Sequence, residues 1–216
     1  ILSEAPNESE ETVLIIDVGT NAELILGNKS ELYACSSPTG PAFEGAQISS
    51  GQRAAPGAIE KIKIDPISKD PIFKVIGCDY WSNEEQFQNF LSNQKITGIC
   101  GSGIIEAIAE MRINGILDKS GLIGSSIETG AKRSITDGRT YSYLLYEDKN
   151  NGENKIKITN ADVRAIQLAK AALFAGSRLL MDEMKIKKVD KIVLAGAFGA
   201  HISTKHAMVL GMIPDC

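Results

Sequence analysis

The stretch LIIDVGTNAELILG, residues 14–27, contains two apolar runs separated by an aspartate, a glycine, a threonine and an asparagine. Runs of this composition predict strands over 13–18 and 22–26, and the short polar segment between them predicts a tight turn. A glycine at such a tip lets backbone N–H groups face an anion, and the hydroxyl and amide side chains add donors. The stretch therefore predicts a β-hairpin whose tip can hold phosphate.

Asp17 stands at the end of the first of these predicted strands. A carboxylate there can hold Mg²⁺ through water or orient an attacking water molecule. Aspartate, glycine and asparagine are also common turn formers, so a turn with a purely structural role stays an alternative.

A second glycine-containing segment, AGAFG at 195–199, follows an apolar run that predicts a buried strand over 191–194. Glycines at 196 and 199 would let a flat ring or a ribose lie directly on the backbone. Close packing of a helix on a strand requires small residues too, and the segment itself does not separate these two interpretations.

The segment CSSPTGPAFEGA, residues 35–46, is too rich in glycine and proline for regular structure beyond a short helix within 41–48. A stiff loop that carries hydroxyl groups usually contacts something. Glu44 is a candidate general base or an acid beside a metal, or else a carboxylate that complements a helix dipole. The segment ICGSG, residues 99–103, could present N–H groups to a phosphate, or could be a tight loop before a helix.

The remaining segments alternate between strand and helix patterns. We expect a third strand over 31–35, a hairpin over 60–65 and 72–76, an antiparallel pair over 141–147 and 155–158, and helices over 104–113, 161–184 and 204–210. Thr159 and Asp162 make a capping box for the longest helix, and Ala172, Ala175 and Gly176 are small enough for close packing. The pattern predicts an α/β fold with a mixed sheet.

Composition excludes several classes of protein. The chain has 216 residues, is 43% hydrophobic and carries a net charge of -4, without a basic stripe for nucleic acid or a polybasic patch for a membrane. No signal peptide or transmembrane segment is apparent, and the cysteines at 35, 78, 100 and 216 lack metal-site spacing, so a cytoplasmic protein with reduced thiols is expected. His201 and His206 are predicted to be surface residues. Residues 1–11 look like a linker, so we expect an excised domain.

The order of these motifs resembles the ATP-binding domain of the reductive activators of corrinoid proteins, which belong to the superfamily of acetate and sugar kinases, Hsp70 and actin. The resemblance covers about residues 13–216 and rests on DVGTN, CSSPTGPAFEGA, GQRAAPGAI, GICGSGIIEAI, ITNADVRAIQLAKAALFAG and VLAGAFGAHI. It implies an actin/Hsp70-like (ribonuclease H-like) lobe over 12–216, with a mixed β-sheet flanked by helices. The chain should be the second of two lobes, truncated at its C-terminus, with a β-hairpin insertion over 135–158.

The resemblance also implies roles for particular residues. DVGTN matches the second phosphate motif of the superfamily, so Asp17 becomes a catalytic residue and a neighbour of Mg²⁺ through water, and Gly19, Thr20 and Asn21 become phosphate contacts. The segment VLAGAFG falls where the family has a glycine-rich segment near the nucleoside, which carries over Gly196, Ala197, Phe198 and Gly199. Ala22 replaces a glycine that is usual in the family.

The implied function is an ATPase that drives one-electron reduction of cobalt(II) to cobalt(I) in a corrinoid protein or corrinoid methyltransferase. Its cofactors would be ATP and Mg²⁺, with an iron–sulfur cluster in the full-length protein outside this segment, and the full-length protein would be a homodimer. We expect the loop with Ser36 and Ser37 to face the corrinoid partner, because it is the stiff, hydroxyl-bearing loop that the nucleotide does not use.

Three other functions are considered. The chain could be a lobe of a small-molecule kinase from the same superfamily, or a non-catalytic lobe that only docks a partner. An activator of acyl-CoA dehydratases would need cysteines that hold a cluster between subunits, and the spacing of Cys35, Cys78 and Cys100 gives no such signature.

Overall fold

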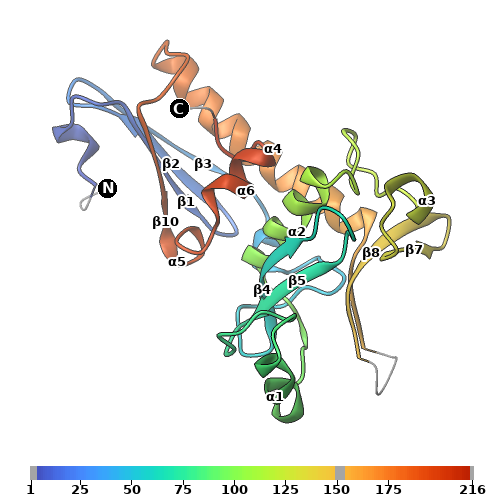
Figure 1. Cartoon of the computed structure of the whole chain (residues 1–216). Coiled ribbons are helices and arrows are strands. Elements are labelled where there is room, and N and C mark those ends of the chain that lie inside the picture. The colour runs from blue at the N-terminus through green and yellow to red at the C-terminus, as the bar shows by residue number, and fades with distance from the viewer. Residues whose placement is uncertain (1–3, 149–153, 215–216) are drawn as a thin grey trace. The chain divides into compact units, whose positions relative to one another are not determined.

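The computed structural model describes residues 4–148 and 154–214, and it divides the chain into two compact units (Figure 1). Unit 1 consists of residues 1–43 and 167–216, and unit 2 consists of residues 44–166. Every residue of the hairpin over 13–26 and of the AGAFG segment falls in unit 1, so the arrangement of these two motifs follows from that unit alone.

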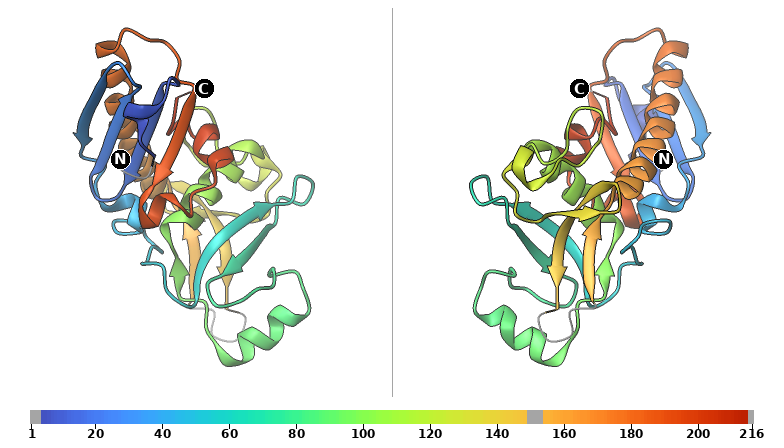
Figure 2. Two further views of the ribbon diagram at one scale, coloured as in Figure 1. Left: turned by 90° about the vertical axis from the view of Figure 1, so that its left-hand side faces the viewer. Right: turned by 90° about the vertical axis from the view of Figure 1, so that its right-hand side faces the viewer.

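Unit 1 is built on a four-stranded sheet in the order β10-β1-β2-β3 (Figure 2). The strands are β1 (Val13–Val18), β2 (Ala22–Gly27), β3 (Leu32–Ser37) and β10 (Lys191–Ala195). β10 runs parallel to β1, whereas the β1/β2 and β2/β3 pairs are antiparallel. The predicted mixed sheet and the predicted hairpin over 13–26 are therefore confirmed.

The long helix α4 (Asn160–Glu183) packs on this sheet from residue 167 onward. Leu173, Gly176 and Leu180 are buried along its inner face, as the helical spacing predicts. A Cβ atom on Gly176 would lie 3.2 Å from Leu24 Cδ1 of β2 and 3.5 Å from Cys35 Sγ of β3. The helix can approach the sheet this closely because residue 176 has no side chain.

Short helical segments complete unit 1: η1 (Pro6–Glu8), η2 (Pro41–Glu44, which ends in unit 2), α5 (Gly196–Gly199) and α6 (Thr204–Val209). Within the expected tail over 1–11, Ser9 O accepts a hydrogen bond from Lys29 N–H at 2.8 Å. The expected helix over 41–48 is wrong beyond Glu44. Gly45 has φ +84°, and a Cβ there would lie 2.5 Å from Gln52 O, so the chain turns at this glycine.

Unit 2 contains a sheet in the order β5-β4-β6, with β4 (Ala58–Ile64), β5 (Pro71–Val75) and β6 (Gly98–Ile99). Helix α2 (Gly101–Ile113) lies against β4. β6 pairs with the first two residues of β4, Ala58 and Ile59. Further along β4, the carboxylates of Glu106 and Glu110 accept hydrogen bonds from Ile62 N–H and Ile64 N–H, at 2.8 and 2.9 Å. These side chains on α2 satisfy backbone donors that would otherwise be left at the edge of the sheet.

A second sheet of unit 2 has the order β7-β8-β9, with β7 (Ser134–Asp137), β8 (Thr140–Glu147) and β9 (Lys155–Ile158). The predicted antiparallel pair is present as β8 and β9, and β7 adds a third strand. Residues 149–153 of the predicted loop between them lie outside the described residues. The unpredicted helices α1 (Gln86–Asn93) and α3 (Ser126–Thr129) also belong to this unit.

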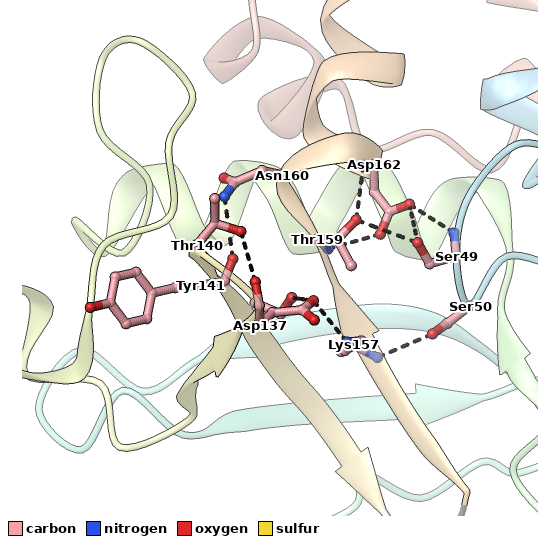
Figure 3. A network of polar contacts seen from close by, with 10 residues as sticks. Ser49, Ser50, Asp137, Thr140, Tyr141, Lys157, Thr159, Asn160 and Asp162 are labelled. Atoms are coloured by element: carbon pink, nitrogen blue, oxygen red, sulfur yellow. Dashed lines mark hydrogen bonds and ion pairs between the residues drawn. The ribbon is translucent and has the colours of Figure 1, made fainter.

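The start of α4 is held by a network of polar contacts in unit 2 (Figure 3). Thr159 Oγ1 accepts from Asp162 N–H at 3.2 Å, and Asp162 Oδ2 accepts from Thr159 N–H at 2.8 Å, which confirms the predicted capping box. Asp162 is 1% exposed, and its other oxygen accepts from the N–H and the hydroxyl of Ser49, at 2.7 and 3.0 Å. A buried carboxylate with this many donors fixes where the helix begins.

Candidate functional site

The two glycine-containing motifs meet at one edge of the sheet of unit 1. β1 ends at Asp17-Val18 and β10 ends at Ala195, and because these strands are parallel neighbours their C-terminal ends lie side by side. Asp17 stands directly opposite Ala195. The hairpin tip of Gly19, Thr20 and Asn21 and the segment that follows β10 therefore belong to one site, at the kind of sheet edge where α/β proteins commonly bind ligands.

Asp17 and Gly196 approach each other closely within this site. Gly196 has φ +81°, and a Cβ atom added to it would lie 2.1 Å from Asp17 Oδ1. The backbone conformation favours glycine at residue 196, and a side chain there would displace the Asp17 carboxylate. The exposed carboxylate of Asp17 thus lies where a side chain of residue 196 would otherwise be.

The rest of α5 faces a different neighbour. The Phe198 ring stacks on the ring of Phe43, with centroids 6.3 Å apart, and Phe43 is completely buried. A Cβ atom on Gly199 would lie 3.3 Å from the backbone of Leu194. Ala197 lies between these residues within the helix. Of the two uses considered for the AGAFG segment, Gly199 shows close packing on the strand, and Gly196 makes room for the Asp17 carboxylate.

Asp17 is one of three exposed polar residues that are paired across the neighbouring strands β1, β2 and β3. Asp17 pairs with Glu23 of β2, and Glu23 pairs with Ser36 of β3. The Ser36 hydroxyl donates to Glu23 Oε1 at 3.4 Å. Two steps between neighbouring strands amount to about 10 Å. Ser36 thus shares the sheet face of Asp17, two strands away from it.

Ser37 and Cys35 lie on the opposite face of β3 from Ser36, toward α4. The Ser37 hydroxyl donates to the carbonyl of Ala172 at 2.7 Å, and Ser37 is 5% exposed. The Cys35 thiol lies 3.7 Å from Gly176 O, and burial raises the pKa of this thiol above its ordinary value. A raised pKa disfavours the reactive thiolate, in keeping with packing as the role of Cys35.

Two other candidates from the sequence, Glu44 and the segment ICGSG, lie in unit 2. Glu44 ends η2 and is the first residue of that unit, so the two candidate carboxylates, Asp17 and Glu44, belong to different units. The glycines of ICGSG lie inside α2, where a Cβ atom on Gly103 would be 2.4 Å from Ile59 O. This contact explains the glycine at residue 103 by close packing of the helix on β4.

Among the described residues there is no group of three or more histidine, cysteine, aspartate or glutamate side chains that could hold a metal ion by themselves. His206 is 9% exposed, so the prediction that it is a surface residue is wrong, whereas His201 is exposed. None of the helices in the described part of the chain has the length and apolar character needed to cross a membrane.

Two residues of this site were missed by sequence reasoning. Glu23 interrupts an apolar run as the outward residue of a strand, and only its pairing on both sides links it to Asp17 and Ser36. Thr39 lies in the SSPTG loop, and its hydroxyl lies 2.8 Å from Gly19 O and 3.1 Å from Thr20 O. The buried environment of Thr39 has no local signal, because the residues that bury it are distant in sequence.

The chain has a mixed sheet flanked by helices, a glycine-containing hairpin at the end of β1, and a second glycine segment after the parallel neighbour β10. These features define it as an α/β domain of the ASKHA class, the superfamily of acetate and sugar kinases, Hsp70 and actin. The family model described as the C-terminal domain of RACo, the ASKHA domain, matches residues 11–216. The chain belongs to this family. The expected resemblance and the expected fold are confirmed.

Individual relatives agree with this assignment. The corrinoid activation enzyme RamQ of Eubacterium limosum is 35% identical, over 93% of this chain and 32% of its own length. The [Co(II) methylated amine-specific corrinoid protein] reductase of Methanosarcina barkeri is 29% identical, over 94% and 35%. A solved structure of a reductive activator for corrinoid, iron–sulfur protein matches with a TM-score of 0.81 and 33% identity, over all of this chain and 32% of the other. The chain spans about a third of the length of these relatives.

Proposed function

We propose that this chain is the ATP-binding lobe of a protein that uses ATP to drive one-electron reduction of cobalt(II) to cobalt(I) in a corrinoid protein or corrinoid methyltransferase. The observation that carries the proposal is the approach of Asp17 to Gly196, at the edge where the phosphate hairpin meets the end of β10. The names of the relatives, a corrinoid activation enzyme and a corrinoid protein reductase, support the choice of partner.

The residues of the site fit Mg-ATP by their chemistry. Asp17 would hold Mg²⁺ through water, because hard cations prefer oxygen ligands and Mg²⁺ usually keeps several of its waters. The tip of Gly19, Thr20 and Asn21 would contact the phosphate oxygens, with the backbone N–H groups of Thr20 and Asn21 as donors. The segment Gly196 to Gly199 would lie near the nucleoside. Glu44, which belongs to unit 2, is proposed separately as a catalytic carboxylate, a general base or an acid beside the metal.

The reaction needs two further contributions. The electron would come from an iron–sulfur cluster in another part of the full-length protein, one electron leaving the cluster and one entering cobalt. ATP would supply free energy by binding more tightly to one conformation of the activator and its partner than to another. We further propose that the full-length protein works as a homodimer in the cytoplasm.

Calorimetric titration tests the nucleotide part of this proposal. We expect Mg-ATP to bind the full-length protein with a stoichiometry of one per chain, and we expect the visible spectrum of the corrinoid partner to change from cobalt(II) to cobalt(I) only when ATP and a reductant are both present. Omitting Mg²⁺ is the control, since the metal should be needed to neutralise the phosphates.

Two results would contradict the proposal in different ways. If the full-length protein did not bind Mg-ATP, the chain would be a lobe that only docks a partner. If it bound Mg-ATP and transferred phosphate to a small molecule while the corrinoid stayed oxidised, the chain would be a kinase lobe.

Ser36 and Ser37 were expected in a loop and lie instead at the end of β3. This end of β3 is proposed to face the corrinoid partner, with Ser36 as the nearer residue because it is exposed. We expect Ser36→Ala to slow ATP-dependent cobalt reduction about threefold to tenfold, the effect of losing one hydrogen bond across an interface, while the affinity for Mg-ATP stays unchanged. The measurement is the reduction rate as a function of partner concentration.

Ser30→Ala is the matched control, since Ser30 is an exposed serine at the other end of the β2–β3 hairpin. Equal reduction rates for Ser36→Ala, Ser30→Ala and wild type at every partner concentration would remove Ser36 from the interface. Ser37→Ala is unsuitable here, because it would leave the Ala172 carbonyl without its hydroxyl donor.

A further inference from the structure

Behind the tip of the phosphate hairpin lies a buried hydroxyl that the proposed function does not use. Thr39 is 5% exposed, and its Oγ1 lies 2.8 Å from Gly19 O and 3.1 Å from Thr20 O. Gly40 N–H donates to the same Thr20 carbonyl at 2.8 Å. A hydroxyl has one proton, so Thr39 shares it between two carbonyls, while the Gly40 amide gives Thr20 O a donor of its own.

These contacts determine where the amides of the tip point. In a planar trans peptide, the C=O of one residue and the N–H of the next point in opposite directions. Holding Gly19 O and Thr20 O toward Thr39 therefore directs the N–H groups of Thr20 and Asn21 away from it. The N–H of Gly19 instead donates within the tip, to Asn21 O at 2.9 Å.

The same contacts keep carbonyl oxygens away from the side of the tip where a phosphate would bind. A carbonyl pointing at the phosphate would repel it, whereas two successive N–H groups attract it. If the tip peptides rotated, their carbonyl oxygens would face the phosphate and their N–H groups would turn away from it.

Thr39 can act in this way because its own position is fixed. Its N–H donates to Ser37 O at 3.0 Å, and the Ser37 hydroxyl is bound to the Ala172 carbonyl of α4. On the other side, the loop continues into Phe43, whose ring stacks on Phe198. The loop is thus attached to a long helix and to α5, and it offers the hairpin tip a rigid support.

We propose that Thr39 is a positioning residue, which orients the peptides of the hairpin tip so that the N–H groups of Thr20 and Asn21 face the phosphates of the nucleotide. This inference rests on the proposed binding of Mg-ATP and adds a residue to that site. It also gives the segment SSPTG two uses, with Ser36 exposed at the end of β3 and Thr39 buried behind the hairpin tip.

The test compares Thr39→Val, which removes the hydroxyl at nearly constant shape, with Thr39→Ser, which keeps it. We expect Thr39→Val to weaken Mg-ATP binding by the full-length protein about fivefold to tenfold, the usual effect of one lost hydrogen bond, and Thr39→Ser to bind within about twofold of wild type. A second measurement is amide hydrogen exchange without nucleotide. Exchange at Gly19 and Gly40, whose N–H groups donate to Asn21 O and Thr20 O of the tip, should be faster in Thr39→Val, and exchange at Ile15, in the middle of β1, should be unchanged.

The exchange measurement separates positioning from general stability, because a merely destabilised sheet would speed up Ile15 as well. Wild-type affinity for Mg-ATP in Thr39→Val, or equal acceleration at Ile15 and at the tip, would overturn the inference and leave the proposed function intact. If wild type itself did not bind Mg-ATP, the proposed function would fail first, and the role of Thr39 toward phosphate would fail with it.

Discussion

Replacing Asp17 by alanine is expected to weaken Mg-ATP binding by about a hundredfold or more and to abolish ATP-dependent cobalt reduction, because the site loses the charged group proposed to hold the metal. The fold should survive this change. Asp17 is exposed and stands directly opposite Glu23, and like charges at paired positions destabilise a sheet. The thermal midpoint of Asp17→Ala without nucleotide should therefore equal or slightly exceed that of wild type. Calorimetric titration and a thermal scan make the two measurements.

Asp182→Ala is the matched control, since Asp182 is an exposed aspartate near the end of α4 whose ion pair with Arg178 lies on the surface. It should bind Mg-ATP as wild type does. An Asp17→Ala protein that also bound Mg-ATP with wild-type affinity would exclude the hairpin from the nucleotide site.

Replacing Gly196 by alanine should have an effect of similar size on binding, although the new methyl group touches no ligand by itself. The added Cβ would lie 2.1 Å from Asp17 Oδ1, so the carboxylate must move away from its position. The backbone at φ +81° adds strain of about 1 kcal/mol for a residue with a Cβ atom. We expect Mg-ATP affinity to fall about a hundredfold because the Asp17 carboxylate is displaced. The backbone strain should lower the thermal midpoint by a few degrees.

Gly130→Ala separates the two causes. Gly130 has φ +73°, and a Cβ atom there would meet nothing within 4 Å, so this variant has the backbone strain without the collision. It should lower the thermal midpoint by a similar amount and leave nucleotide binding unchanged. If Gly196→Ala lost only as much affinity as Gly130→Ala, the proximity of residue 196 to Asp17 would have no functional meaning.

Sequence reasoning succeeded where the signal is local. The β1–β2 hairpin, the start of α4 and the strand before AGAFG were predicted close to their observed bounds, since each depends on neighbouring residues: an apolar run beside turn formers, or a capping box. The helix expected to continue to residue 48 failed because Gly45 takes a left-handed conformation under Gln52, which is a contact between loops. The strand β7 was missed because it is stabilised by pairing with β8.

The family was recognisable from the order of the motifs, and the match over residues 11–216 confirms it. The same order could not reveal that Asp17, Glu23 and Ser36 form one row, or that Thr39 lies behind Gly19 and Thr20. Both facts depend on which strands pair and on where a loop returns to the sheet.

By itself, the sequence determined the β1–β2 hairpin and its tip, the capped helix α4 and membership of the family, because hydrophobic period, turn residues and motif order are properties of neighbouring residues along the chain. Only the tertiary structure decided that β10 lies beside β1, which brings Gly196 to Asp17, and that Thr39 supports the tip. The physical reason is that these contacts join residues far apart in sequence. The free energy that stabilises these contacts comes from burying the sheet against α4, and no short stretch of sequence encodes that burial.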